Sequence, residues 1–248
     1  MSVLELEGVS RQFGGLRAVD GVTLSIGSGI TALIGPNGAG KTTLFNLMSG
    51  LLPVSSGRIR FRGQDITKLP AHRRAKLGMA RTLQIKQVFA GLTVLENTWI
   101  AARQRHRPLD PFRPAANDRA TRAAAEAALE TMGLEAMAGR QAGSLAYGDI
   151  ALLEIAMALA TQPALLLLDE PVCGMSPSET ERTVARIRTL SATTDVVIVE
   201  HDMDVVFGLA DRVVVLAEGR VLADGPPAVI AREPAVREAY LGEDEEAA

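Results

Sequence analysis

The chain has 248 residues, enough to bury a full core as one large domain or as one domain with a sizeable insert. Its net charge of −3, from 26 basic and 29 acidic residues, provides no overall positive field to attract nucleic acid or anionic lipid. The single cysteine, Cys173, excludes an internal disulfide and a thiolate metal site, which fits a reducing compartment. We find no signal-peptide pattern and no run near the ~20 apolar residues of a membrane span, so we expect a cytoplasmic protein whose membrane link is a partner.

Short β-rich segments come first in the chain. The expected strands are residues 3–6, 22–26, 30–34 and 58–61, with a helix beginning near Thr42 and a short helix over 70–77. The basic side chains of the second helix are expected to form a solvated face: His72, Arg73, Arg74 and Lys76. His72 and His106 are interpreted as structural residues.

The middle of the chain is predicted to be helical. Thr93 and Glu96 form a capping box, which predicts a helix over 93–103. Residues 103–114 combine prolines with a basic cluster over 103–107 that no Phe, Tyr or Trp interrupts, so we expect an exposed linker without the aromatic interleaving of a nucleic-acid site. An alanine-rich helix over 115–131 is expected to stop at Gly133.

The second half alternates strand and helix as in a parallel sheet with covered faces. The expected strands are residues 165–168, 196–199 and 213–216, and a turn at Glu218–Gly219 predicts a hairpin into 220–223. Ser176, Pro177 and Glu179 predict the start of a helix that runs to about Leu190. The acidic tail over 243–246 is expected to be disordered.

A phosphate-binding loop, GPNGAGKTT, stands between the predicted strand over 30–34 and the helix that follows. Backbone N–H groups of such a turn, with the helix N-terminus behind them, bind a triphosphate. Lys41 is expected to reach the β- and γ-phosphates, Thr42 to provide an oxygen to Mg²⁺, and Thr43 to face the α-phosphate. The predicted nucleotide-binding residues of the loop are Gly35, Pro36, Asn37, Gly38, Ala39, Gly40, Lys41, Thr42 and Thr43. The alternative is a glycine-rich turn that arose by chance.

Two acids follow the buried strand over 165–168. In an open α/β sheet ligands gather at the carboxyl ends of strands, so Asp169 and Glu170 are expected near the phosphate loop. Asp169 is suited to hold Mg²⁺ through water, and Glu170 to orient and deprotonate the attacking water. The alternative is a strand-end acid that caps the next helix. His201 also follows a predicted strand, which makes it a candidate for the same site.

These motifs, in this order from Val3 to about Gly242, resemble those of ATP-binding-cassette (ABC) ATPases. GPNGAGKTT resembles the Walker A motif, LLLLDEP over 165–171 the Walker B motif, and VEHD around His201 the switch-histidine motif. Gln84 in RTLQ resembles the Q-loop glutamine, which in the family contacts Mg²⁺ and the attacking water beside the membrane partner. Phe13 matches the aromatic position that stacks on adenine, although it could also be a core strand residue. Residues 174–177 fall at the family's D-loop.

The resemblance implies an α/β fold: a P-loop NTPase with a RecA-like parallel-sheet core, an N-terminal antiparallel β subdomain and a helical signature subdomain. The expected division is 1–84 and 160–248 for the catalytic core with its β subdomain, and 85–159 for the helical subdomain. ATP and Mg²⁺ are the implied cofactors, and a second ABC ATPase subunit completes the site. The further implied partners are integral-membrane permease subunits and, indirectly, a periplasmic or extracellular substrate-binding protein. The expected location is peripheral, at the cytoplasmic face of the membrane.

The ABC signature, expected to act in trans, departs from the common LSGGQ. It comprises Leu145, Ala146, Tyr147, Gly148 and Asp149. Ala146 replaces the serine whose hydroxyl would reach the γ-phosphate, which should cost roughly 1.5–3 kcal/mol at most. The N–H groups at Gly148 and the helix start can still face a triphosphate. An asymmetric pairing, in which the partner's site dominates, stays open.

Further motifs resemble those of the branched-chain amino acid importer ATPases. They are FGGL over 13–16, RTLQ over 81–84, TVLEN over 93–97, GMSP over 174–177, VEHDM over 199–203 and the ending AYLGE. Urea, amide and aromatic-acid importers use similar ATPase subunits and stay as alternatives for the cargo. Val88, Phe89 and Trp99 are candidates for the surface that meets the permease, although Val88 and Phe89 could equally pack inside.

Two other classes fit the sequence less well. A small GTPase or kinase shares the phosphate loop, but this class is disfavoured because no Asn-Lys-x-Asp guanine reader is present. A soluble cassette ATPase that acts on nucleic acid or ribosomes is disfavoured by the near-neutral charge and by the lack of a long coiled coil or second cassette.

Overall fold

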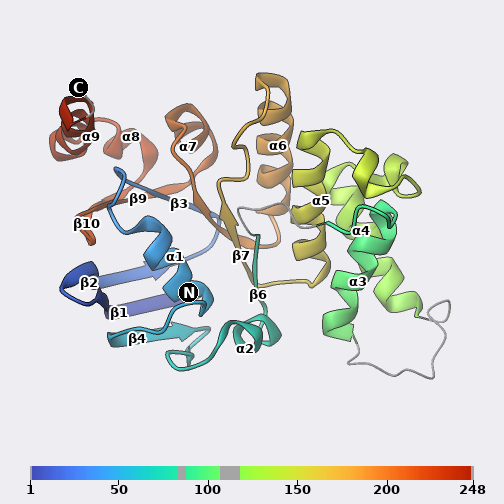
Figure 1. The fold of residues 1–248 in the computed structure, drawn as a ribbon, viewed down its shortest axis with the longest axis horizontal. Coiled ribbons are helices and arrows are strands. Elements are labelled where there is room, and N and C mark those ends of the chain that lie inside the picture. Colours follow the sequence, from blue (N-terminus) through green and yellow to red (C-terminus); the bar gives the residue numbers. More distant parts are fainter. Residues whose placement is uncertain (1, 83–87, 107–117, 247–248) are drawn as a thin grey trace. The chain divides into compact units, whose positions relative to one another are not determined.

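The computed structural model describes residues 2–82, 88–106 and 118–246. The chain divides into two compact units. The first unit comprises Met1–Leu77 and Thr194–Ala248, and the second unit comprises Gly78–Thr193. Each unit has strands and helices of its own, which Figure 1 shows along the course of the chain.

An antiparallel sheet with the strand order β2-β1-β4-β5 opens the first unit. Its strands are β1 (Leu4–Phe13), β2 (Leu16–Ile26), β4 (Ser56–Phe61) and β5 (Gln64–Asp65). Leu4 and Leu6 are buried along β1, so this strand turns one face towards the core. The strands expected from the sequence are confirmed here, and pairing across the β1–β2 hairpin extends both of them.

A mainly parallel group of strands forms the other sheet region of the first unit. The strand β3 (Ile30–Ile34) is buried at every residue and pairs in parallel with β8 (Asp195–Val199) and with β9 (Arg212–Ala217). The last strand, β10 (Arg220–Gly225), is antiparallel to β9. Glu218 and Gly219 both have positive φ, as a two-residue type I′ turn requires, so the predicted hairpin is confirmed.

Five helices complete the described part of the first unit: α1 (Lys41–Ser49), α2 (Ala71–Lys76), α7 (Met203–Leu209), α8 (Pro227–Ile230) and α9 (Pro234–Glu246). The helix expected near Thr42 begins one residue earlier, because Gly40 adopts the left-handed conformation just before it. The expectation of a disordered tail over 243–246 is wrong, since these residues continue α9.

Arg74 corrects the expected solvated face of α2. It is only 2 % exposed, and its guanidinium donates to the carbonyl oxygens of Leu47 (2.7 Å) and Met48 (2.8 Å) in the last turn of α1. Further bonds go to Leu69 and Thr67. Burial lowers the pKa of the Arg74 guanidinium to about 10. A cation at this end of a helix is favoured by the helix dipole, which helix periodicity alone does not reveal.

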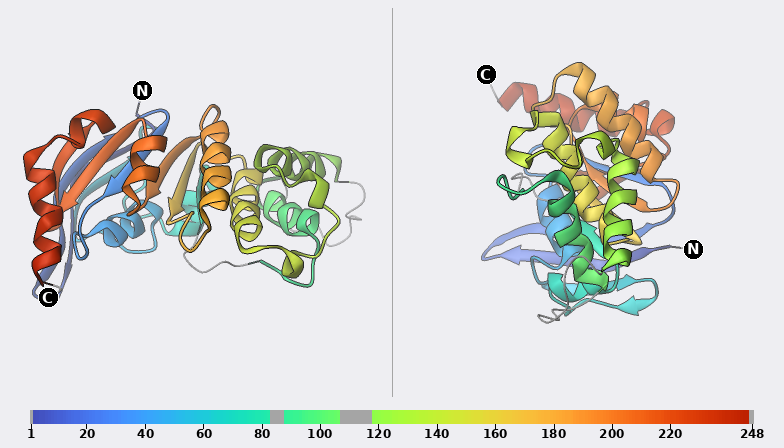
Figure 2. Two further views of the ribbon diagram at one scale, coloured as in Figure 1. Left: turned by 90° about the horizontal axis from the view of Figure 1, so that it is seen from above. Right: turned by 90° about the vertical axis from the view of Figure 1, so that its right-hand side faces the viewer.

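The second unit combines a strand pair with four α-helices in its described residues. The strands β6 (Met79–Arg81) and β7 (Leu165–Asp169) are parallel. The helices are α3 (Val94–His106), α4 (Arg119–Met132), α5 (Tyr147–Ala160) and α6 (Pro177–Leu190). The first three pack against one another, as Figure 2 also shows. Within residues 2–82, 88–106 and 118–246, no helix is long and apolar enough to cross a membrane.

Two of the predicted helix termini in the second unit are confirmed, and one is corrected. In the predicted capping box, Thr93 N–H donates to Glu96 (2.7 Å) and Glu96 N–H donates to the Thr93 hydroxyl (3.1 Å). Gly133 ends α4 in the left-handed conformation, as expected. The linker expected over 103–114 is wrong at its start, because α3 continues to His106 and Arg103 stacks on Trp99 at 5.2 Å. Residues 107–114 lie outside the described residues.

Candidate active site

The phosphate loop joins β3 to α1 in the first unit, and its backbone requires glycine at specific positions. Gly35 has φ +147°, and a Cβ there would lie 2.1 Å from the carbonyl oxygen of Leu216. Gly40 has φ +97°, and a Cβ there would lie 2.4 Å from the carbonyl oxygen of Ala18. These approaches leave no space for a side chain, so the loop shape depends on glycine for both conformation and packing.

Lys41 lies across this loop. Its ammonium donates to the carbonyl oxygens of Gly35 and of Pro36, the latter at 2.9 Å. Gly40, which has no side chain to cap the helix, precedes α1, so backbone N–H groups and a positive dipole end open onto the loop. This combination of a lysine and a helix N-terminus is suited to bind phosphate.

The turn between β9 and β10 supports the phosphate loop, and sequence reasoning missed this role. Gly219 N–H donates to the carbonyl oxygen of Ala39 at 3.0 Å, and Asp20 N–H donates to Gly219 at 2.8 Å. A Cβ at Gly219 would lie 2.9 Å from the Ala18 carbonyl oxygen. The only sequence signal was the hairpin turn itself, which does not indicate what the turn contacts.

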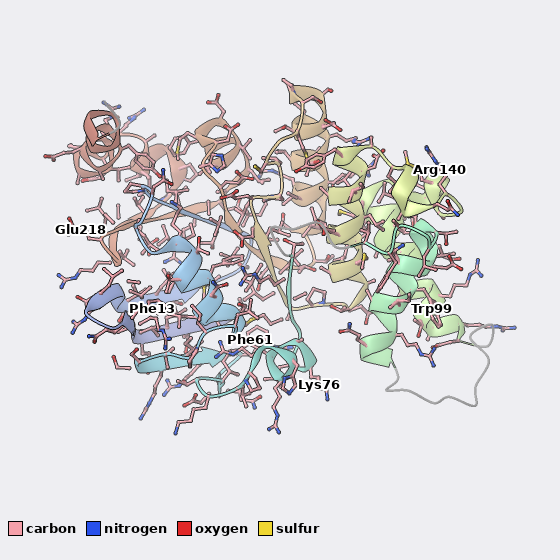
Figure 3. All side chains as sticks on the ribbon, viewed as in Figure 1. Phe13, Phe61, Lys76, Trp99, Arg140 and Glu218 are labelled. Carbon is pink, nitrogen blue, oxygen red and sulfur yellow. The ribbon has the colours of Figure 1, made fainter. Side chains whose placement is uncertain are left out.

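Phe13 ends β1 at the hairpin that β1 forms with β2 (Figure 3). It is 42 % exposed, so the alternative of a core strand residue does not hold. The Arg11 guanidinium lies over one face of its ring, 4.5 Å from the centroid. An exposed aromatic ring with a cationic neighbour is a suitable platform for a stacked base.

His201 follows β8 in the first unit and is exposed. Leu33 on β3 pairs with Val199 on β8, so the chain leaves both parallel strands at the same sheet edge, one into the phosphate loop and one towards His201. Asp202 accepts from the N–H groups that open α7 and thereby fixes the turn after the histidine. The preceding Glu200 is buried, at 1 % exposure.

Asp169 ends β7 in the second unit, where its carboxylate forms an ion pair with Arg81 at 2.9 Å. The side chains of Arg81 and Asp169 are 12 % and 3 % exposed. Thr82 completes the contact, because its N–H donates to Leu167 at 3.0 Å and its hydroxyl accepts from Asp169 N–H at 3.4 Å. Burial raises the pKa of the Asp169 carboxyl, and Arg81 opposes that rise. Sequence reasoning quoted RTLQ only as a family motif and did not assign Arg81.

Glu170 adopts a positive φ of +47°, which is uncommon for a residue with a side chain. Such strain is held where the surrounding structure determines the conformation, and it clusters at functional sites. The next residues form a tight turn, in which Cys173 N–H donates to the Glu170 carbonyl oxygen at 3.2 Å. This conformation supports the prediction that Glu170 has a special role.

The signature residues begin α5, and their surroundings explain two departures from LSGGQ. Asp149 is buried and pairs with Arg182 on α6, with 2.5 Å between the carboxylate and the guanidinium. The Tyr147 ring lies over Gly174, whose Cβ would be 3.4 Å from the tyrosine hydroxyl. Ala146 precedes the helix and provides no side-chain cap. Tyr147 and Asp149, which differ from the common pattern, therefore both make contacts within the second unit.

The predicted site residues fall in three groups. The phosphate loop, Phe13 and His201 belong to the first unit, whereas Asp169, Glu170 and residues 145–149 belong to the second. Gln84 lies outside the described residues. Their assigned roles stay predictions. Among the described residues, no group of three or more His, Cys, Asp and Glu side chains could hold a metal ion by itself.

Sequence comparisons define the class of protein. The family model described as ABC transporter matches residues 19–173, and a second, described as branched-chain amino acid ATP-binding cassette transporter, matches residues 220–246. The chain belongs to the ABC transporter family, as one of its ATP-hydrolysing, nucleotide-binding subunits. The predicted family is thereby confirmed.

Individual relatives cover nearly the whole chain. It is 42 % identical to the high-affinity branched-chain amino acid transport ATP-binding protein BraF of Pseudomonas aeruginosa, over 97 % of this chain and 98 % of BraF. It is 41 % identical to LivG of Escherichia coli K12, with the same coverage. A probable LivG of Archaeoglobus fulgidus is 36 % identical, over 98 % of this chain and 96 % of the relative.

Solved structures agree with the predicted fold. A nucleotide-free ATP-binding cassette from an ABC transporter superposes with a TM-score of 0.85 at 30 % identity, over 97 % of this chain and 99 % of the other. The ADP conformation of a cassette gives a TM-score of 0.84 at 30 % identity, over 98 % and 99 %. The α/β P-loop fold with parallel strands, an antiparallel sheet and a helical part is confirmed.

Proposed function

We propose that this chain is the ATP-hydrolysing subunit of an importer for branched-chain amino acids. The observation that carries the cargo assignment is the near full-length similarity to BraF and LivG, whose names state branched-chain amino acid transport. The match of residues 220–246 to a model for the same transport class supports it independently of the nucleotide motifs. In our proposal the cargo does not contact this subunit, so the cargo assignment depends on sequence similarity to ATPase subunits of the same transport class.

The predicted residues divide the chemistry among them. The loop N–H groups and Lys41 bind the triphosphate, and Phe13 stacks on the base. Glu170 orients the attacking water and accepts its proton, Gln84 contacts that water and Mg²⁺, and His201 is the third catalytic residue. The positive φ of Glu170 and the glycine-shaped loop support these roles.

Mg²⁺ is the implied metal, and the donors fit it. Thr42, Gln84 and Asp169 provide oxygen atoms, which are the ligands that Mg²⁺ prefers together with phosphate oxygens and water. Asp169 is buried at the end of β7, as a carboxylate that meets a cation would be. When bound, the ion would neutralise charge on the phosphates. Arg81 would hold the Asp169 carboxylate in place for it.

A second ATPase subunit completes the site in our proposal, with residues 145–149 acting in trans. ATP then joins the two subunits, and its hydrolysis removes charge-assisted contacts between them. Phe89 is 56 % exposed and Trp99 is half-buried on α3, which supports a contact surface for the permease. The protein is then peripheral, at the cytoplasmic face of the membrane, and meets the substrate-binding protein only through the permease.

Replacing the predicted general base tests the hydrolytic mechanism. In Glu170→Gln, ATP binding should be retained and hydrolysis should fall by about 10²-fold or more, because proton transfer to the carboxylate is lost. The matched control is Glu181→Gln, an exposed glutamate on α6. Titration with ATP and steady-state turnover measure both effects, and unchanged turnover in Glu170→Gln excludes it as the base.

Uptake assays test the cargo. A strain that lacks this gene is complemented with the wild type or with Lys41→Ala, and the uptake of labelled leucine, urea and an aromatic acid is compared. Leucine uptake should return with the wild type only. Restoration of urea or aromatic-acid uptake in its place supports the alternative importers, and salt-dependent RNA or DNA binding supports a soluble cassette ATPase.

A further inference from the structure

The N-termini of α5 and α6 share a single carboxylate. Through Oε2, Glu179 accepts from the Ser176 N–H at 3.0 Å, as in the capping box of α6, and also from the Ser176 hydroxyl at 2.7 Å. Through Oε1 it accepts from Gly148 N–H at 3.0 Å, thirty-one positions earlier in the chain. One side chain therefore caps two helices, which the local sequence pattern at 176–179 does not indicate.

The contact with α5 explains why glycine stands at position 148. Gly148 does not have a positive φ, so its conformation alone does not require glycine. A Cβ there would lie 2.7 Å from Glu179 Oε1 and 3.0 Å from its Cδ. Any side chain at 148 would displace the carboxylate from the N–H group that it caps.

A second link joins the same two helices one turn further along α6. Asp149 and Arg182 form their ion pair at 2.5 Å, and the Asp149 side chain is only 11 % exposed. Arg182 also adds to the contacts that lower the pKa of Glu179, after the hydrogen bonds from Ser176 and Gly148. Two adjacent signature residues are thus tied to α6 by two independent charge-assisted contacts.

We propose that Glu179 is a positioning residue that holds the signature start of α5 and the start of α6 as one rigid element. The inference rests on the proposed function, in which the signature over 145–149 meets the nucleotide of the partner subunit. Because Glu179 links the start of α5 to the start of α6, the signature keeps a fixed orientation towards that nucleotide. The serine-free signature then depends on this orientation, since Ala146 offers no hydroxyl of its own.

The test replaces Glu179 by glutamine in the transporter purified with its own partner subunits. Glutamine keeps the shape but has a single acceptor oxygen, so one of the two helices loses its cap. We expect kcat of the assembled transporter to fall about tenfold, while the ATP affinity of the isolated chain, which reports its own phosphate loop, stays within twofold. Glu181→Gln is the matched control and should leave both quantities unchanged.

Arg182→Gln provides a second variant that breaks the other link. This variant should also lower kcat, but by less than Glu179→Gln does, because the Arg182 side chain is 44 % exposed. A wild-type kcat in Glu179→Gln overturns the inference, whatever Arg182→Gln shows. A fall in ATP affinity as large as the fall in kcat also overturns it, because it indicates general structural damage. A wild-type transporter that hydrolyses no ATP contradicts the proposed function and, with it, this inference.

Discussion

The two units hold their predicted site residues by different means. In the first unit the phosphate loop is shaped by main-chain atoms, with Gly35 against the Leu216 carbonyl and Gly40 against the Ala18 carbonyl. In the second unit side-chain charges hold the residues, through Arg81 with Asp169 and Arg182 with Asp149. A Cβ has no space at either glycine, so these two positions tolerate few substitutions. This difference fits a Walker A motif that matches its family closely and a signature that does not.

Adding a methyl group to the loop should produce the largest effect. Gly35→Ala forces a strained φ and places a Cβ 2.1 Å from a carbonyl oxygen, which should cost up to roughly 6 kcal/mol in the free energy of unfolding. Gly63→Ala is the control, because Gly63 also has a positive φ but nothing lies within 4 Å of its Cβ position, so it should cost about 1–2 kcal/mol. Urea unfolding measures both, and equal losses would contradict the packing argument.

Breaking the ion pair at the end of β7 should come next. Arg81→Met leaves the Asp169 carboxylate buried without its cation and should cost about 3–5 kcal/mol. The control Arg122→Met removes an exposed ion pair with Glu126, in which the charged atoms are 2.8 Å apart. It should cost less than about 0.5 kcal/mol in the free energy of unfolding. Chemical denaturation of the two variants gives the comparison, and a loss as small in Arg81→Met as in the control would show that burial does not matter here.

Arg74 is the place where the first unit does use a buried side-chain charge. Arg74→Met removes the donors to the last carbonyl groups of α1 and should cost about 2–3 kcal/mol. The neighbouring Arg73 is exposed on the same helix, and Arg73→Met should stay within about 0.5 kcal/mol of the wild type. Thermal unfolding distinguishes them. Similar losses of stability in both variants would show that the buried contacts of Arg74 do not stabilise the protein.

The smallest expected effect concerns the capping box at the start of α3. Hydrogen bonds from the Thr93 N–H and hydroxyl lower the pKa of Glu96 below its ordinary value of 4.5. A lowered pKa adds stability that is present above 4.5 and is lost as the pH falls through the folded-state value. The Tm difference between the wild type and Glu96→Gln should therefore be full at pH 7 and shrink in acid. A Tm difference that does not change with pH would exclude the ionised carboxylate as the source.

Most elements were predictable from local patterns. The phosphate loop, the buried strand over 165–168 and both capping boxes follow from residues close together in the chain, because glycine conformation, strand burial and helix capping are local effects. The roles of Arg74 and Arg81 were missed because their partners are distant in the chain. Met48, which Arg74 contacts on α1, is 26 positions away, and Asp169, the partner of Arg81, is 88 positions away.

By itself, the sequence determined the family, the phosphate loop and the identity of the charged groups at the ends of β7 and β8. Only the tertiary structure decided which of those groups are paired: that Arg81 holds Asp169, that Asp149 is joined to Arg182, and that Glu179 caps α5 as well as its own helix. The physical reason is that burial and charge pairing depend on distance in space. Chain spacing predicts that distance within one helix or turn but not between elements.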